Sequence, residues 1–220
     1  MPGYQTKTES LRVGDREFRM RSLLDRQQYA DPERAAERAG VPAAAWPLFG
    51  QLWPAGRILA AAMDTALAGN PRVLEVGCGL GLASLVLQRR GVDVSASDYH
   101  PLAGEFLDHN AALNGLARIP FTCCDWSGAA VPLGTFDLIV GSDLLYERAH
   151  PADLSGFIRR HAAPGARVVI VDPGRRQRGR FTRCMQEHGF SDRRVSVDTP
   201  VSRALAFSGT LSTYTLPRAA

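Results

Sequence analysis

The sequence of 220 residues has no long apolar run, no paired cysteines and almost no lysine. No apolar stretch approaches the roughly 20 residues that cross a bilayer, so we expect no membrane-spanning helix. Residues 1–10 also lack the apolar core of a secretory signal peptide, and we therefore expect a cytoplasmic protein without a membrane partner. A hydrophobic fraction of 45% over this length predicts a globular protein with a full core.

The cysteines form no Cys-x-x-Cys pair, and no histidine cluster accompanies them. This spacing argues against a structural zinc site and against a disulfide framework, so no metal is predicted. We expect reduced and mostly buried thiols at all four positions, Cys78, Cys123, Cys124 and Cys184.

Lysine occurs once, at Lys7, among 26 basic residues. A coding bias toward GC-rich codons explains this preference for arginine most simply. The functional alternative is a need for bidentate contacts between guanidinium groups and phosphate or carboxylate. The formal net charge of +4 does not by itself indicate a nucleic-acid partner, and none is expected.

From residue 72 onward, predicted strands and helices alternate along the chain. The strands are expected at 72–76, 92–97, 119–123, 136–140 and 166–171. The helices between them are expected at 81–90, 101–114 and 152–162. This alternation predicts an α/β fold with a parallel sheet covered on both faces. After a helix near 178–188, two further strands near 195–197 and 204–216 predict a closing antiparallel hairpin.

Residues 1–45 are expected to form an N-terminal extension to the domain at 46–220. Alternating residues on either side of Gly14-Asp15 predict a small hairpin, and a short helix over 33–39 should follow, opened by Asp31-Pro32 and ended by Gly40. These residues could cover the site as a lid or offer an interaction surface.

Two tryptophans precede a further predicted helix that begins at Pro54 and ends at Asn70-Pro71. Trp46 is expected in the core. Trp53 lies at the junction between loop and helix, where a role facing a ligand and a packing role are equally plausible.

The stretch at 72–81 combines a short apolar strand, a glycine turn and the start of a helix. Glycine lets the backbone approach a ligand closely, and the free N–H groups of a helix start point toward it. The spacing, Gly77-x-Gly79-x-Gly81, differs from the Gly-x-Gly-x-x-Gly of dinucleotide-binding proteins. An acid, Glu75, precedes the first glycine. The stretch predicts a site for a nucleotide-like ligand.

Acidic residues follow the next two predicted strands. Asp98 comes about 20 residues after the glycines, where a carboxylate can accept both hydroxyl groups of a ribose. The less favoured alternative is a cap for the helix near Pro101, and an NAD enzyme would also place an acid there. Asp125 could accept an adenine amino group while Trp126 stacks on the ring. Their alternative roles are a turn residue and a cover for the sheet edge.

Ser142, Asp143 and Tyr146 follow the fourth predicted strand, at the point where a parallel sheet opens onto its ligand. Ser142 should lie against the cofactor. Asp143 and Tyr146 share a face if the segment turns helically, which makes them candidates for holding a second substrate. The alternative is that Asp143 caps a following helix and Tyr146 packs.

Taken together, these motifs resemble those of the class I S-adenosylmethionine (SAM) methyltransferases, and among them the family-16 protein-lysine methyltransferases. The signature of that group is the Asp-x-x-Tyr element, present here as Asp143-Leu-Leu-Tyr146. The run Ile170-Val-Asp-Pro-Gly-Arg-Arg-Gln177 resembles the loop after strand five in the lysine methyltransferases of the electron-transfer flavoprotein β subunit. The resemblance covers about residues 46–190.

The resemblance implies a Rossmann-like, doubly wound sheet of seven mostly parallel strands with a C-terminal antiparallel hairpin. It also implies SAM as cofactor and a protein lysine as methyl acceptor. Asp143 is then expected to bind the acceptor, with proton acceptance as a second role, and Tyr146 to orient it. The residues expected at the cofactor are Trp53, Glu75, Gly77, Cys78, Gly79, Asp98, Asp125, Trp126 and Ser142.

Other functions are compatible with the same motifs. A small-molecule N- or O-methyltransferase could share the fold, because fold does not fix substrate. Nucleic-acid enzymes that methylate adenine usually carry a Pro-Pro pair after strand four, where this chain has Leu144-Leu145, although the arginine cluster at 175–183 keeps a nucleic acid in consideration. A non-catalytic binding module and an NAD enzyme complete the alternatives. We expect a monomer.

Overall fold

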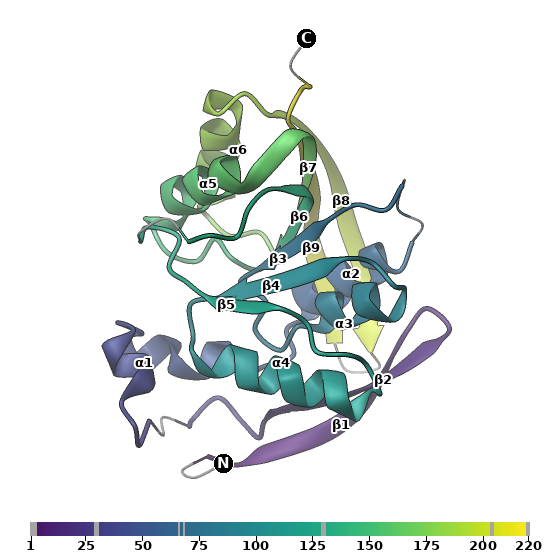
Figure 1. Ribbon diagram of the computed structural model, residues 1–220, viewed down its shortest axis with the longest axis vertical. Coiled ribbons are helices and arrows are strands. Elements are labelled where there is room, and N and C mark those ends of the chain that lie inside the picture. Colours follow the sequence, from purple (N-terminus) through teal and green to yellow (C-terminus); the bar gives the residue numbers. More distant parts are fainter. Residues whose placement is uncertain are drawn as a thin grey trace.

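A seven-stranded sheet with strand order β5-β4-β3-β6-β7-β9-β8 forms the centre of the molecule (Figure 1). The computed structural model describes residues 4–28, 31–65, 67, 69–128, 131–202 and 205–218. The first five strands in this order run parallel, whereas β9 is antiparallel to both of its neighbours. The strands are β3 (Val73–Val76), β4 (Val94–Asp98), β5 (Phe121–Cys123), β6 (Phe136–Ser142), β7 (Ala162–Asp172), β8 (Ser191–Ser202) and β9 (Leu205–Thr215). The predicted fold class is confirmed.

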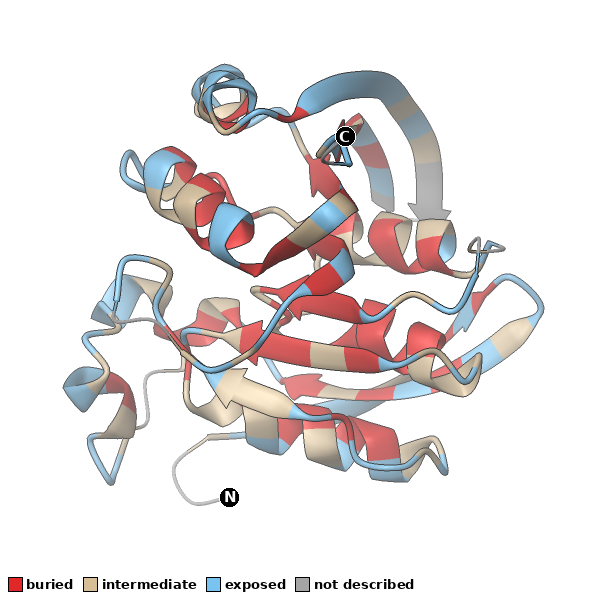
Figure 2. Cartoon of the chain, turned by 45° about the horizontal axis from the view of Figure 1, so that its top comes forward, coloured by how far each residue is buried: buried red, intermediate tan, exposed pale blue. Residues whose placement is uncertain are grey.

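Helices cover both faces of the sheet. One face carries α2 (Pro54–Met63), α3 (Leu82–Arg89) and α4 (Leu102–Leu113), and the other carries α5 (His150–His161) and α6 (Arg178–Glu187). The central strands alternate between the two hydrophobic clusters, with Val73 in the first and Leu74 in the second. All four residues of β3 are buried, as expected for a parallel strand covered on both sides (Figure 2).

The N-terminal hairpin forms as predicted, with β1 (Thr6–Val13) and β2 (Arg16–Leu23) joined at Gly14-Asp15. It lies against α4, and its apolar side chains Phe18 and Met20 belong to the first hydrophobic cluster. The Oδ1 atom of Asn110 on α4 accepts the Arg21 N–H at 2.7 Å. The hairpin therefore shares the core of the sheet. A division of the chain at residues 45 and 46 stays a prediction.

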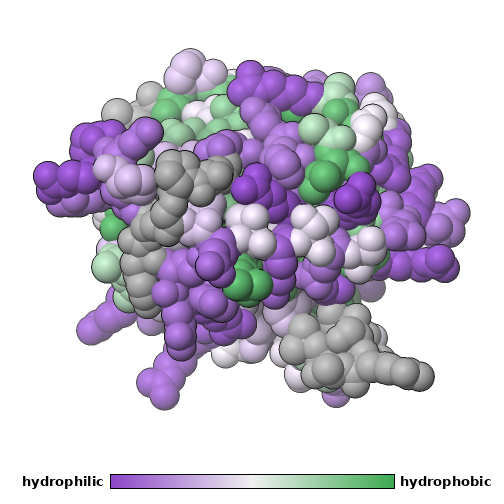
Figure 3. All heavy atoms as spheres, turned by 90° about the horizontal axis from the view of Figure 1, so that it is seen from below, coloured by the Kyte–Doolittle hydropathy of each residue, from purple (hydrophilic) through white to green (hydrophobic). Residues whose placement is uncertain are grey.

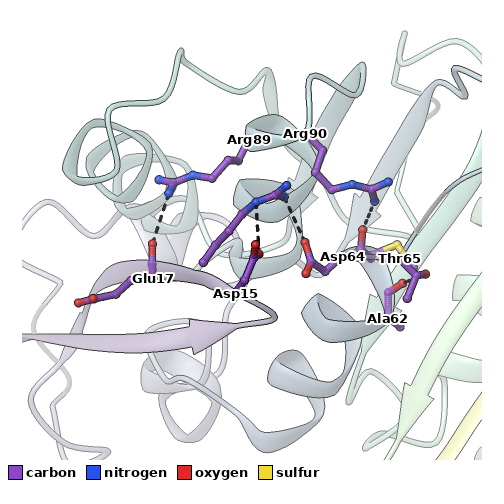
Figure 4. A network of polar contacts seen from close by, with 9 residues as sticks. Asp15, Glu17, Ala62, Asp64, Thr65, Arg89 and Arg90 are labelled. Carbon is purple, nitrogen blue, oxygen red and sulfur yellow. Dashed lines mark hydrogen bonds and ion pairs between the residues drawn. The ribbon is translucent and has the colours of Figure 1, made fainter.

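Charged side chains connect the hairpin to the helices behind it and connect two of those helices to each other (Figure 4). Arg16 forms an ion pair with Asp64 at the end of α2, at 3.2 Å. Arg89 of α3 donates to the backbone carbonyl of Glu17 at 3.3 Å, and Arg90 donates to the carbonyl of Met63. The face of the molecule that is seen from below is mainly hydrophilic (Figure 3).

Several predicted boundaries were wrong for local reasons. α2 ends at Met63, well before Asn70-Pro71, and the Met63 carbonyl accepts a hydrogen bond from the Arg90 side chain where a longer helix would use it. α1 (Ala35–Arg38) starts later than Pro32, because the Asp31 carboxylate caps the N–H groups of Ala35 and Glu37. It leads into a 3-10 turn, η1 (Ala43–Leu48).

Two further expectations need correction. β7 and β8 extend well beyond 166–171 and 195–197. β7 begins at Ala162, which pairs with Phe136 of β6, and β8 is long because it pairs with β9 along most of its length. Of the cysteines, only Cys78 and Cys124 are buried, whereas Cys123 at the end of the edge strand β5 is exposed. Among the described residues, no helix combines the length and the apolar character that crossing a membrane requires.

Candidate active site

A cavity of about 550 Å³ opens at the carboxyl ends of the parallel strands. Its volume lies within the range of small-molecule sites. The structure places every residue that the sequence assigned to the site in the wall of this cavity: Trp53, Glu75, Gly77, Cys78, Gly79, Asp98, Asp125, Trp126, Ser142, Asp143 and Tyr146. Their individual roles stay predictions, but the ends of β3, β4, β5 and β6 and the start of α2 do bring them together.

The glycine turn after β3 can be made only by glycine. Gly77 and Gly79 have φ angles of 58° and 51°, in the left-handed region that a side chain disfavours. A Cβ atom on Gly79 would lie 2.9 Å from the backbone oxygen of Phe49, and one on Gly77 would overlap the side chain of Leu144. Neighbouring atoms therefore pack tightly against the turn, and its backbone lines the cavity.

Glu75 provides the N-terminal cap of α3 from a neighbouring element. The helix begins after Gly81, which has no side chain to cap it. The Oε2 atom of Glu75 accepts the backbone N–H of Ser84 at 2.8 Å and also the Ser84 hydroxyl. Burial raises the pKa of Glu75 to about 7. Glu75 lines the cavity, but part of its carboxylate is already engaged in holding the turn and the helix together.

Asp98 joins the end of β4 to the glycine turn. One carboxylate oxygen accepts the N–H of Gly79 and the other accepts the N–H of His100, both at 2.8 Å. Asp98 therefore shapes the start of the loop before α4, in addition to facing the cavity. Each carboxylate oxygen has a second lone pair, so the predicted contact with ribose hydroxyls remains chemically available.

His100 and residues of the segment 40–49 also line the cavity, and none of them was among the predicted site residues. The His100 ring stacks on Phe49 with 4.0 Å between ring centroids, and burial lowers its pKa to about 4. Its Nδ1 atom accepts the N–H of Leu102, so the neutral ring caps α4. The position of His100 between Asp98 and the predicted helix start was the only available signal.

Specific contacts hold the aromatic residues of the cavity wall in place. Trp46 is buried in the core, as predicted. Trp53 donates from Nε1 to the carbonyl of Leu48 at 2.8 Å, and the Arg26 guanidinium lies over its ring. The Trp126 ring meets His150 edge to face. These contacts fix both indoles beside the cavity, where each presents a partly exposed face.

Asp125 has the contacts of a turn residue, which is the alternative role that the sequence allowed for it. It is exposed, and its carboxylate accepts both the N–H and the hydroxyl of Ser127, at 3.0 and 2.9 Å. This is the local turn that aspartate commonly forms. Asp125 nevertheless lines the cavity, so the structure is compatible with the turn role and with contact to a ligand.

Asp143 forms the opposite wall together with an unexpected partner, Arg175. The Arg175 Nε and Nη2 atoms donate to the two oxygens of Asp143 at 2.7 and 2.9 Å, a bidentate pair. The Asp143 side chain is 11% exposed and that of Arg175 is 41% exposed. The sequence placed Arg175 in a loop but not in the site, because the two residues are 32 positions apart.

The helical turn expected after β6 does not form. Asp143 has a φ of 55°, and its N–H donates to the carbonyl of Val171 on β7 at 2.9 Å. The left-handed conformation stops any helix at this point, and α5 begins only at His150. Both sequence interpretations of Asp143, a shared helical face with Tyr146 and a helix cap, were therefore wrong. Asp143 and Tyr146 still line the same cavity.

The loop after β7 presents Arg175 to Asp143. Buried Asp172 accepts the N–H groups of Gly174 and Arg175, both at 2.8 Å, and so fixes the turn. Tyr146 contacts His150 edge to face and is 46% exposed at the rim. This side of the cavity is thus built from the loops after β6 and β7.

Known proteins match this architecture and these motifs. A family model described as a methyltransferase domain matches residues 26–202. The chain belongs to the methyltransferase domain family. It is 31% identical over 145 residues to the electron transfer flavoprotein beta subunit lysine methyltransferase of Mus musculus, covering 64% of this chain and 56% of that protein. The chain thus spans only about half the length of this relative.

Two other known proteins match more of the length of this chain. It is 32% identical over 212 residues to the protein-L-isoaspartate O-methyltransferase of Methylorubrum extorquens, covering 83% of this chain and 87% of that protein. The 16S rRNA N2 G1207 methyltransferase of T. thermophilus, solved in complex with AdoMet and guanosine, has a TM-score of 0.66 at 17% identity, covering 99% of this chain and 52% of that one. At that identity the structural likeness shows the shared fold.

The methyltransferase domain of this chain has SAM as its cofactor. The cavity fits such a group. The glycine turn leaves no space for a Cβ atom behind it, so its backbone can face a ligand directly. Asp98 and the two partly exposed indoles supply acceptor oxygens and flat apolar surfaces. Among the described residues, no cluster of His, Cys, Asp and Glu has the arrangement of a metal site.

Proposed function

We propose that this methyltransferase transfers a methyl group from SAM to a lysine side chain of a protein. The observation that carries the proposal is the Asp143 carboxylate, placed with Tyr146 on the cavity wall by the loop after β6. The Asp-x-x-Tyr spacing and the similarity to a lysine methyltransferase support it. An anionic group at this wall would attract and orient a lysine ammonium entering from solvent.

In this proposal the cavity has a cofactor half and an acceptor half. Trp53, the glycine turn, Asp98, Trp126 and Ser142 would hold SAM, which supplies a methyl group on a positively charged sulfur. The protein then has to align the acceptor nitrogen with that methyl carbon and exclude water. Alignment alone can lower a barrier by several kcal/mol, with an upper range of about 7–11 kcal/mol.

A lysine has an ordinary pKa of ~10.4 and must lose a proton before its nitrogen can attack. A carboxylate alone would stabilise the ammonium and oppose this loss. The bidentate contact with Arg175 offsets much of the Asp143 charge, so the wall can orient the amine without holding it strongly in its cationic form. Tyr146 adds an uncharged hydrogen-bonding group, because partial burial and nearby carboxylates raise its pKa to about 12.

The test is transfer from tritiated SAM to a cell lysate. Label that stays with acid-precipitated protein, resists alkali and emerges as methyl-lysine after hydrolysis is the expected result. Label confined to the acid-soluble fraction would instead indicate a small-molecule acceptor. Alkali-labile label on protein would indicate a methyl ester, the product class expected of an O-methyltransferase such as the isoaspartate relative.

Other features of the proposal remain to be measured. The cytoplasmic location and the monomeric state stay predictions from the sequence. Calorimetry with SAM and with NAD separates the methyltransferase from the NAD-enzyme alternative, and tight binding of SAM alone is expected.

A further inference from the structure

An arginine-rich face lies beside the acceptor half of the cavity. Residues 175–183 contain five arginines and no acid. Arg175 is bound to Asp143, and Arg178 turns inward to donate to Thr210. The remaining members are exposed, and we call them, with an arginine of the loop before α5, the arginine face: Arg148, Arg176, Arg180 and Arg183.

Two members of the arginine face lie on one side of α6. Arg180 and Arg183 are three residues apart on this helix, and Arg176 lies in the turn just before it. The Arg180 Nη1 atom donates to the carbonyl of Arg148 at 2.9 Å, and so connects this side of the helix to the loop that follows Tyr146. Figure 2 shows the outward turns of α6 as exposed.

This arrangement opposes the stability of α6. Cations are unfavourable near a helix N-terminus, and like charges four residues apart repel each other. α6 has no acidic residue in its first turn and no basic residue in its last. Within the described part of the chain, no member of the arginine face forms an ion pair with an acid. A cluster of like charges that destabilises a helix and forms no ion pairs is typical of a functional surface.

The neighbouring cavity rim has the opposite charge. Glu147 and Asp153 line the cavity with Asp143, on the side where the acceptor would enter. A lysine suits this acidic rim, whereas the surface a few residues away suits carboxylates. The two regions touch, because Arg175 belongs to the cavity wall and Arg176 follows it directly.

We propose that the arginine face binds acidic residues that flank the acceptor lysine in a protein substrate. The inference rests on the proposed function and adds the character of the substrate sequence. Arg180 and Arg183 are three residues apart, about 4.5 Å along the helix axis, which an extended peptide spans with one or two residues. Because Arg176 directly follows Arg175 of the cavity wall, the acidic residues would lie within a few positions of the lysine.

The test measures binding of short fluorescent peptides that contain one lysine flanked by glutamates, or by glutamines in a matched control peptide. The protein variant replaces Arg176, Arg180 and Arg183 by glutamine. The control variant replaces Arg12, Arg19 and Arg193, which are exposed on the hairpin and on β8, and so removes the same charge elsewhere. Thermal unfolding and SAM binding verify that both variants are folded.

The glutamate peptide should bind more tightly than the glutamine peptide, with a preference that weakens as salt is added. The arginine-face variant should lose about 3- to 30-fold in affinity for it, and the control variant should lose little. Equal binding of the two peptides, or an unchanged preference in the arginine-face variant, would overturn the proposal. So would tighter binding of a single-stranded RNA oligomer that depends on the same arginines.

The lysate experiment separates this proposal from the proposed function. If the unaltered protein produces methyl-lysine and the arginine-face variant produces as much, the docking proposal fails while the function stands. If the unaltered protein produces no methyl-lysine, the function itself fails, whatever the peptides show.

Discussion

The two halves of the cavity are held in place in different ways. In the cofactor half, carboxylates accept backbone N–H groups, as Asp98 accepts from Gly79 and Glu75 accepts from Ser84. In the acceptor half, the decisive contact joins two charged side chains from separate loops, Asp143 and Arg175. The glycine turn of the first half excludes any side chain, whereas the contact in the second half depends on two side chains, one of them partly exposed.

This difference indicates how the fold divides its tasks. A common cofactor needs one unchanging binding surface, and a tightly packed glycine turn with a capped helix provides it. An acceptor has to enter, be recognised and leave, which suits an ion pair whose arginine is partly exposed. Substitutions in the first half should therefore disturb folding and cofactor affinity, and those in the second should disturb transfer.

The largest effect is expected for Gly79→Ala in the cofactor half. The new Cβ atom would meet the Phe49 carbonyl while the residue keeps a left-handed backbone. We expect a loss of at least about 100-fold in SAM affinity and about 3–4 kcal/mol in the free energy of unfolding. The matched control is Gly91→Ala, where φ is 74° but no atom lies within 4 Å, and about 1–2 kcal/mol should be lost. Calorimetry with SAM measures the affinity of both variants, and urea unfolding measures their stability. Equal losses in the two variants would contradict the specific role of Gly79 in the glycine turn.

The second effect concerns Glu75 and the pH dependence of stability. Because its folded pKa of about 7 lies above its ordinary value of 4.5, the folded state retains a proton that the unfolded state releases between these values. The contribution of Glu75 is therefore most favourable below pH 4.5 and is lost as pH rises through 7. It should amount to on the order of 3 kcal/mol.

Urea unfolding at about pH 5 and about pH 8 compares the unaltered protein with Glu75→Gln. The variant should show a smaller fall in stability between the two conditions. Glu187→Gln, at an exposed position of α6, serves as the control and should behave like the unaltered protein. An identical pH dependence in all three proteins would contradict the buried, protonated Glu75.

The third effect lies in the acceptor half. Asp143→Ala should reduce kcat/KM for methyl transfer by about 100-fold, because a misplaced acceptor loses alignment. SAM affinity should change by less than about 3-fold, since Asp143 contacts Arg175 and not the glycine turn. The double variant with Arg175→Ala measures how much of the loss comes from the unpaired guanidinium. Unchanged transfer would remove Asp143 from the acceptor site, and a loss of SAM binding would move it to the cofactor half.

The smallest effect separates the two aspartates of the cofactor half. Asp98→Asn keeps one acceptor oxygen but loses the charge that holds two backbone N–H groups, so SAM affinity should fall by about 10-fold. Asp125→Asn changes an exposed turn residue and should cost about 2- to 3-fold. Calorimetry with SAM compares them, and a larger loss at Asp125 would reverse the assigned importance of the two residues.

Much of the architecture could be predicted because its signals are local. Alternating apolar strands and amphipathic helices predicted the parallel sheet, and the closing hairpin followed from the two last strands. Boundaries were less accurate where distant groups intervene. The end of α2 involves Arg90 from another helix, and the length of β8 depends on its pairing with β9.

For the site itself, the sequence alone determined the glycine turn, the acids at the strand ends and the family to which the chain belongs. These features can be recognised from short motifs, because glycine adopts a left-handed turn most readily and acids that follow predicted strands lie at the ligand-binding edge of a parallel sheet. The tertiary structure decided which residues from other parts of the chain complete the cavity. It brought Arg175 to Asp143, His100 and Phe49 to the cavity wall, and the arginine face to the rim, because packing of loops from separate strands brings together residues that no sequence spacing connects.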